Sequence, residues 1–152
     1  MKGKEMSYYT YIEYGYGFCV DDIHTTPDKL LKLAAMRLDV LRDVRSYLNE
    51  IFPDGYKDED LTMENFNDLE GDYCEYGLSY VLYNVINDLE IVYANDYNGT
   101  EFILYTPTYP WHMHEEERNL TQDDVKNIFM KYISVLTDDY VPIIYYSVEN
   151  GG

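Results

Sequence analysis

The chain has 152 residues, of which 46% are hydrophobic and 16% aromatic, and a formal net charge of −18. This length and aromatic content indicate a single folded domain over residues 1–152 and exclude a disordered acidic tail. The charge excludes nucleic acid and anionic membranes as direct ligands, because binding them needs a Lys/Arg surface and only 11 basic residues exist. With no apolar run of membrane-spanning length and no signal-like start, we expect a soluble cytoplasmic protein. The two cysteines, Cys19 and Cys74, are then expected as free thiols.

The first predicted element is a strand over Tyr8–Val20. Its even positions from Ile12 onward are large and apolar. Its odd positions Gly15, Gly17 and Cys19 are small. This alternation is typical of a strand with two different faces. The small face would allow a helix or another backbone to approach closely.

A long helix is predicted next, from Pro27 to about Phe52. Thr26 is a favourable N-cap, Pro27 suits the first helical position, and the Asp28 carboxylate complements the helix dipole. Apolar residues then recur at helical spacing, and a Pro-Asp-Gly turn sequence follows at residues 53–55.

The middle of the chain combines helical and strand patterns. A short helix is expected over Thr62–Leu69, and a second helical pattern covers Leu78–Leu89. Two β-type segments follow, Ile91–Tyr97 and Thr100–Thr106, with Asn98-Gly99 between them. Asn-Gly in this position predicts a hairpin with a type I′ turn, because both central residues of that turn need positive φ.

The last third of the chain is predicted as a loop, a helix and a strand. The loop covers residues 107–119. Thr121 and Asp124 resemble a capping box at the start of a helix whose apolar positions reach Leu136. Tyr140–Val148 is the last predicted strand, and its proline places it at a sheet edge or near a strand start.

The order of these elements predicts an α+β fold. We expect a mainly antiparallel sheet of about four strands with helices packed on one face. An acidic helical insertion is expected at about residues 53–75. Without it, the order is β-α-β-β-α-β, which is compatible with a ferredoxin-like arrangement.

The negative charge is concentrated in the centre of the chain. Residues 58–117 contain fifteen acidic side chains and no Lys or Arg, whereas residues 1–57 and 118–152 have net charges of −1 and −2. The densest part runs from Asp54 to Glu75. Two interpretations stay open: a solvated face that keeps the protein soluble, or a surface that meets a basic partner through complementary charge.

Two groups stand out among the 19 tyrosines. Those in the first and last predicted strands are expected mostly in the sheet and the core. A second group lies within or beside the acidic block, where a ring that attracts Arg stands near carboxylates, as in a surface that binds Arg and Lys. This second group is Tyr56, Tyr73, Tyr76, Tyr80, Tyr83, Tyr93 and Tyr97.

The most enzyme-like segment is residues 111–117. His112 and His114 would point to the same side of an extended segment, and His and carboxylate suit zinc or iron. The possible further ligands are Glu115, Glu116 and the remote His24. The spacing matches no specific metal motif, and Cys19 lies in an apolar strand that disfavours a thiolate. We therefore expect no catalysis, cofactor or metal site, and keep a small metal-dependent enzyme that uses the His112/His114 loop as an alternative.

In size, charge and its Asp54–Glu75 block, the chain resembles the small acidic inhibitors that bacteriophages encode against host nucleases. It is similar in character to anti-CRISPR proteins that present carboxylates where a nuclease expects DNA phosphates. The resemblance implies a nucleic-acid mimic in the host cytoplasm, whose partner is a basic nucleic-acid-binding protein such as a CRISPR effector nuclease. The expected partner-binding residues are Asp58, Glu59, Asp60, Glu64, Asp68, Glu70, Asp72, Tyr73, Glu75 and Tyr76.

Other functions stay open beside this one. An immunity protein that neutralises a basic toxin nuclease would use the same physics of electrostatic steering. A structural or phage-assembly protein would need its acidity only for solubility. The tyrosine-rich first strand would also suit the edge of a homodimer.

Overall fold

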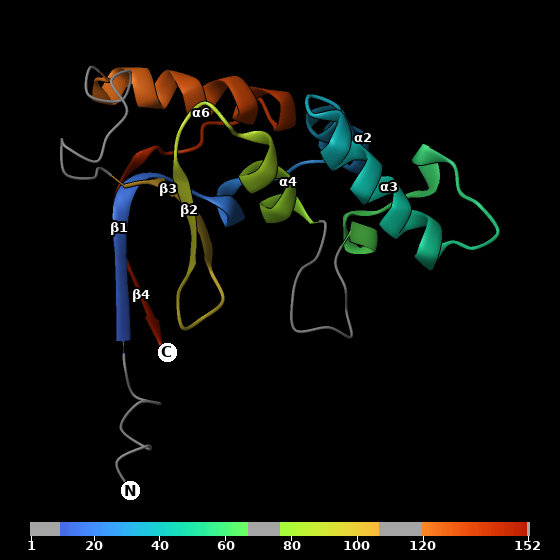
Figure 1. Cartoon of the computed structure of the whole chain (residues 1–152), viewed down its shortest axis with the longest axis horizontal. Helices are drawn as coiled ribbons and strands as arrows, with labels where there is room; N and C mark the ends of the chain where they lie inside the picture. Colours follow the sequence, from blue (N-terminus) through green and yellow to red (C-terminus); the bar gives the residue numbers. More distant parts are fainter. Residues whose placement is uncertain (1–9, 67–76, 107–119, 152) are drawn as a thin grey trace, which may run out of the picture.

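The computed structural model of the chain places a small sheet beside a group of helices (Figure 1). The structure describes residues 10–66, 77–106 and 120–151. In chain order, with η for a 3-10 helix, the elements are β1 (Thr10–Cys19), η1 (Val20–Asp22), α2 (Pro27–Ala34), α3 (Leu38–Ile51), η2 (Asp58–Asp60), η3 (Met63–Phe66), α4 (Leu78–Val85), β2 (Ile91–Asn95), β3 (Glu101–Tyr105), α6 (Gln122–Leu136) and β4 (Ile144–Gly151). This order confirms the predicted α+β class.

The described strands form one antiparallel sheet in the order β2-β3-β1-β4. β4 is an edge strand and Pro142 lies just before its start, so both positions predicted from the proline are found. β4 pairs with β1 from Thr10↔Gly151 to Gly17↔Ile144. β3 pairs with β1 only over Tyr16–Cys19. The ferredoxin-like arrangement is not confirmed, and the described connection from β1 to β2 contains three α-helices rather than one.

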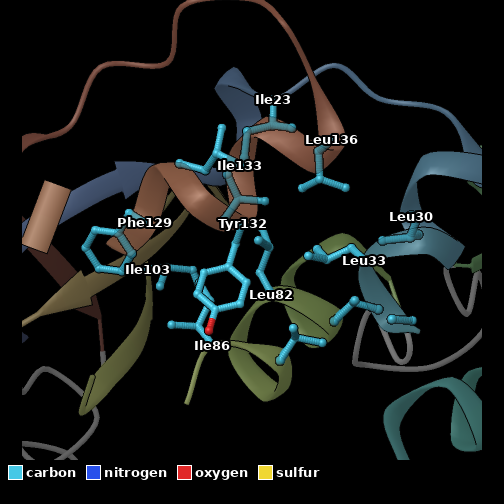
Figure 2. Close-up of a cluster of buried hydrophobic side chains, with 14 of the residues drawn as sticks. Ile23, Leu30, Leu33, Leu82, Ile86, Ile103, Phe129, Tyr132, Ile133 and Leu136 are labelled. Atoms are coloured by element: carbon cyan, nitrogen blue, oxygen red, sulfur yellow. The ribbon is translucent and has the colours of Figure 1, made fainter. Parts of the chain in front are cut away.

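The main core lies between the sheet and the helices. Phe18 of β1 and Ile103 of β3 are fully buried in one cluster with residues of all the described α-helices. The rings of Phe18 and Phe129 meet edge to face, with their centroids 5.2 Å apart. Figure 2 shows α6 contributing Phe129 and Tyr132 to this cluster, opposite Leu82 of α4. Helices therefore pack on one face of the sheet, as predicted, and burial of these side chains supplies about 1.5–3 kcal/mol each.

The other face of the sheet carries a smaller cluster formed by strands. Its buried members are Cys19, Ala94, Phe102, Leu104 and Val148. The outer strands β2 and β4 also contact each other, so the sheet curls around this cluster. The curl depends on Gly15 and Gly17, because a Cβ atom would lie 2.5 Å from the Tyr105 oxygen at the first and 2.0 Å from the Ile103 oxygen at the second. The predicted close approach on the small face of β1 is confirmed, and the approaching backbone is that of β3.

The long helix predicted from Pro27 to Phe52 is two helices. α2 ends at Ala34 and α3 begins at Leu38, with Arg37 in an extended conformation between them. Leu38 is 76% exposed, whereas Val40 is buried. The break therefore shifts the helical phase, so that α3 turns Val40 and not Leu38 toward the core. A continuous apolar spacing did not reveal this change of phase.

The predicted hairpin forms, but its turn is different. The Gly99 N–H donates to the Asp96 carbonyl at 3.1 Å, and the Asp96 carboxylate accepts from the N–H groups of Asn98 and Thr100. The turn therefore spans Asp96–Gly99, one residue earlier than a type I′ turn centred on Asn98-Gly99. The Asp96 side chain explains the shift, because Asp commonly hydrogen-bonds to the backbone two residues ahead.

The remaining boundaries follow local chemistry. The capping box of α6 is confirmed: Thr121 Oγ1 accepts from the Asp124 N–H, and the Asp124 carboxylate accepts from the Thr121 N–H. α4 ends at Val85, and the apolar positions that follow, Ile86 and Leu89, are buried outside the helix. The predicted helix over residues 62–69 is described only as far as η3.

Helices do not cover the whole apolar face of β1. Ile12 and Tyr14 of β1 are exposed, as is Tyr145 of β4, which lies on the same face. Tyr14 and Tyr145 therefore lie in the sheet, as expected, but not in the core. Over Tyr16–Cys19, β1 is an interior strand of the sheet, and a homodimer formed through it stays a prediction.

Candidate functional site

The candidate site is a short acidic segment between α3 and the first gap in the described chain. Asp58, Glu59 and Asp60 form η2, and Glu64 lies in η3. All four side chains are exposed, and we refer to these residues as the acidic segment. The other predicted partner-binding residues lie outside the described residues: Asp68, Glu70, Asp72, Tyr73, Glu75 and Tyr76.

Two apolar side chains anchor the acidic segment. Leu61 and Phe66 are buried in the main core. They hold the chain against the helices, since η2 contacts α2 and η3 contacts α3. Carboxylates that repel one another favour an expanded chain, and the burial of Leu61 and Phe66 opposes that tendency. The acidic segment is therefore fixed to the fold with its charges in solvent.

One basic residue partly balances this charge. Arg45 of α3 donates to the Asp58 carboxylate at 3.4 Å and to the Tyr56 hydroxyl at 3.2 Å. Among the described residues, Asp58 is the only member of the acidic segment with an ion-pair partner. Glu59, Asp60 and Glu64 therefore keep their charge available to a partner.

The structure adds a carboxylate that the sequence analysis did not assign to the site. A hollow of about 420 Å³ is lined by Asp28 of α2 together with Asp58 and Glu59. Thr26 donates a hydrogen bond to the Asp28 carboxylate at 2.5 Å, which lowers the pKa of Asp28. Three carboxylates therefore surround one hollow, and such an arrangement can receive an Arg or Lys side chain. No local signal could have joined Asp28 to Asp58, because they meet only through the contact of α2 with η2.

The tyrosines predicted beside the acidic block take several positions. Tyr56 accepts the hydrogen bond from Arg45 and packs against Phe52. Tyr80 and Tyr83 of α4 gather with Tyr93 of β2 around a separate cavity. Tyr97 is exposed in the hairpin turn. Of the described tyrosines of this group, only Tyr56 therefore stands beside the acidic segment.

The metal hypothesis receives no support from the described residues. His112, His114, Glu115 and Glu116 lie outside them, and His24 is exposed. No group of three or more His, Cys, Asp or Glu side chains in the described parts of the chain is arranged to hold a metal ion. The Cys19 thiol is buried, and this burial raises its pKa, as the prediction of a disfavoured thiolate requires.

Comparisons with known proteins add no family to these observations. No protein-family model, curated protein or solved structure matches the chain. Within the described ranges, no helix has the length and apolar character needed to cross a membrane. The functional argument therefore rests on the geometry and charge of the residues themselves.

Proposed function

We propose that the protein is an acidic inhibitor that binds the basic nucleic-acid-binding surface of a nuclease and performs no catalysis of its own. The observation that carries the proposal is the acidic segment. Its four carboxylates are exposed, Leu61 and Phe66 anchor it to the core, and only Asp58 is paired with a described basic residue, Arg45. A nuclease surface that holds DNA phosphates is rich in Lys and Arg. Carboxylates fixed on a folded scaffold can occupy such a surface in place of phosphates.

The position of the acids supports this proposal over a general role in solubility. An acidic surface needed only for solubility works with its charges dispersed. Here Asp58, Glu59 and Asp60 are consecutive, and Asp28 adds a fourth carboxylate next to them from a different helix. Concentrated charge of one sign speeds association with a partner of opposite sign and selects that partner.

The test compares two variants that lose the same number of charges. The first removes the acidic segment: Asp58→Asn, Glu59→Gln, Asp60→Asn and Glu64→Gln. The control removes four exposed acids elsewhere: Asp123→Asn, Asp138→Asn, Asp139→Asn and Glu149→Gln. Circular dichroism verifies that both variants fold. The measurement is inhibition of DNA cleavage by a purified CRISPR effector nuclease and by a basic toxin DNase.

We expect the wild-type protein and the control variant to inhibit cleavage and the acidic-segment variant to lose inhibition. Binding should weaken steeply with salt, and duplex DNA should displace the inhibitor from its partner. Inhibition retained by the folded acidic-segment variant would contradict the proposal, and so would equal loss in both variants, because net charge alone would then explain it.

The same assay separates the proposed function from its alternatives. Inhibition of the toxin DNase alone would favour an immunity protein. If the protein inhibited neither nuclease, the remaining candidate functions would be a structural role and a metal-dependent enzyme. For the enzyme, metal analysis of the purified protein tests the His112/His114 hypothesis directly.

A further inference from the structure

A second site candidate is a cavity of about 530 Å³ lined by residues of α4 and of strands β1, β2 and β3. Figure 1 shows α4 beside β2 and β3, and both strands contact it. The cavity is lined by Ser79, Tyr80, Tyr83 and Asn84 of α4, Val92 and Tyr93 of β2, Glu101 of β3 and Glu13 of β1. Its volume falls in the range of small-ligand sites. None of these lining residues belongs to the acidic segment.

Two residues that line this cavity each carry a buried polar atom with no hydrogen-bond partner among the described residues. Ser79 is 7% exposed, and among the described residues its hydroxyl makes no hydrogen bond. Among the described residues, the buried Oε2 atom of Glu13 also has no hydrogen-bond partner. Leaving a hydroxyl and a carboxylate oxygen buried without partners is unfavourable. Both residues line one cavity, so a ligand in that cavity lies next to both side chains.

The charge of the cavity selects a cation. Glu101 adds a second carboxylate, which accepts a hydrogen bond from the Tyr93 hydroxyl at 2.6 Å. Arg37 reaches this region by donating to the main-chain oxygen of Asn84 at 3.0 Å, but its guanidinium is paired with Asp39, also at 3.0 Å. Arg37 is thus engaged away from the two glutamates, and the described lining residues carry two carboxylates and no Lys or Arg.

We propose that this cavity binds an organic cation, namely an ammonium or guanidinium group on an aliphatic stem. The Glu13 carboxylate accepts charge-assisted hydrogen bonds from the cationic group, and the Ser79 hydroxyl accepts a further one. The rings of Tyr80, Tyr83 and Tyr93 pack against the stem and attract the cation through their faces. The cation is either a free amine or the Lys or Arg side chain of a protein. This site does not depend on the proposed nuclease inhibition.

Isothermal titration calorimetry tests the proposal with three probes on the full chain. Agmatine carries both cationic groups on a free aliphatic stem. Acetyl-Gly-Arg-Gly-amide presents the guanidinium on a peptide. Butylurea resembles the guanidinium end of agmatine but is neutral. Each probe is titrated into the wild-type protein, the Glu13→Gln and Ser79→Ala variants, and the control Asp138→Asn, which removes an exposed charge elsewhere.

We expect at least one cationic probe to bind the wild-type protein and butylurea to bind much more weakly. Glu13→Gln should weaken cation binding by about tenfold or more, Ser79→Ala by a smaller factor, and Asp138→Asn hardly at all. Glu13→Gln should melt at the same or a higher temperature than wild type, because the Glu13 Oε2 atom is buried without a hydrogen-bond partner among the described residues. That result distinguishes loss of binding from loss of folding.

The two cationic probes identify the source of the ligand. Binding of agmatine supports the proposal and identifies the ligand as a free amine. Binding of the peptide alone supports the proposal and identifies the ligand as a protein side chain. Binding of neither cation, or equal binding to wild type and Glu13→Gln, would overturn the proposal. The cavity proposal does not depend on nuclease inhibition, because the residues of the two sites are different. It would stand even if the acidic-segment variant inhibited the nuclease as well as the wild type.

Discussion

The hydroxyl of Tyr132 on α6 donates a hydrogen bond to the carboxylate of Asp88, just beyond the end of α4. Lys131 donates to the other oxygen of the same carboxylate. Figure 2 shows the Tyr132 ring reaching from α6 to the vicinity of Ile86. Asp88 thus joins α6 to the segment between α4 and β2. Burial opposes ionisation of Asp88, but the hydrogen bonds from Lys131 and Tyr132 outweigh it and lower its pKa.

Replacement of Asp88 should make stability less dependent on pH. Because folding lowers the Asp88 pKa below its ordinary 3.8, its contribution is complete above about pH 4 and is lost as pH falls through the folded-state value. We expect Asp88→Asn to cost about 1 kcal/mol at pH 7, a modest value because the side chain is partly exposed. Urea unfolding at pH 7 and at pH 3 measures the difference, which should shrink at the lower pH. An equal cost at both pH values, or a similar cost for exposed Asp138→Asn, would contradict this assignment.

Gly17 should be far less tolerant of alanine than Gly55. At Gly17 the new Cβ would lie 2.0 Å from the Ile103 carbonyl oxygen, so β1 and β3 would have to separate. We expect a cost of about 3 kcal/mol or more. Gly55 has a φ of +94° but open space around it, so alanine there should cost only about 1–2 kcal/mol. Thermal unfolding followed by circular dichroism compares the two variants, and similar melting temperatures would disprove the close approach of the two strands.

Thr121 and Thr26 both precede helices, but only the first should act as a side-chain cap. Thr121 Oγ1 accepts from the Asp124 N–H, so Thr121→Ala should cost about 1 kcal/mol. The Thr26 hydroxyl instead donates to the Asp28 carboxylate, and α2 has no side-chain cap. Thr26→Ala should therefore have a clearly smaller effect in chemical denaturation. The reverse order of the two variants would contradict the assigned caps.

Removal of Arg45 should strengthen the acidic segment as a ligand. Arg45→Gln removes the cation that donates to Asp58 and Tyr56. Because the pair is largely exposed, we expect a stability loss below about 1 kcal/mol. If the proposed function is correct, the variant should bind a basic nuclease at least as tightly as wild type and with a stronger salt dependence. Arg42→Gln on the same helix is the control, since its paired acid is Asp43. Weaker nuclease binding by Arg45→Gln alone would indicate that the partner needs the segment held by Arg45.

Features that depend on neighbouring residues were predictable from the sequence. The capping box of α6 needs only Thr121 and Asp124, and the existence of the β2–β3 hairpin follows from its strand pattern and its turn residues. The exact turn was not predictable in this way, because the Asp96 carboxylate competed with the Asn-Gly preference. For the candidate site, both interpretations of the acidic block implied exposed carboxylates, and the acids at positions 58, 59, 60 and 64 are exposed.

Sequence by itself determined the α+β class, the helical and extended segments, and the concentration of negative charge in the centre of the chain, because these depend on composition and short-range periodicity. Tertiary structure alone decided the break before α3, since the helical phase there depends on which side of the helix meets the core. It also placed Asp28 beside Asp58, and Glu13 with Ser79 in one cavity. These pairs are distant in sequence, and only the packing of α2 against η2 and of α4 beside the sheet brings them together.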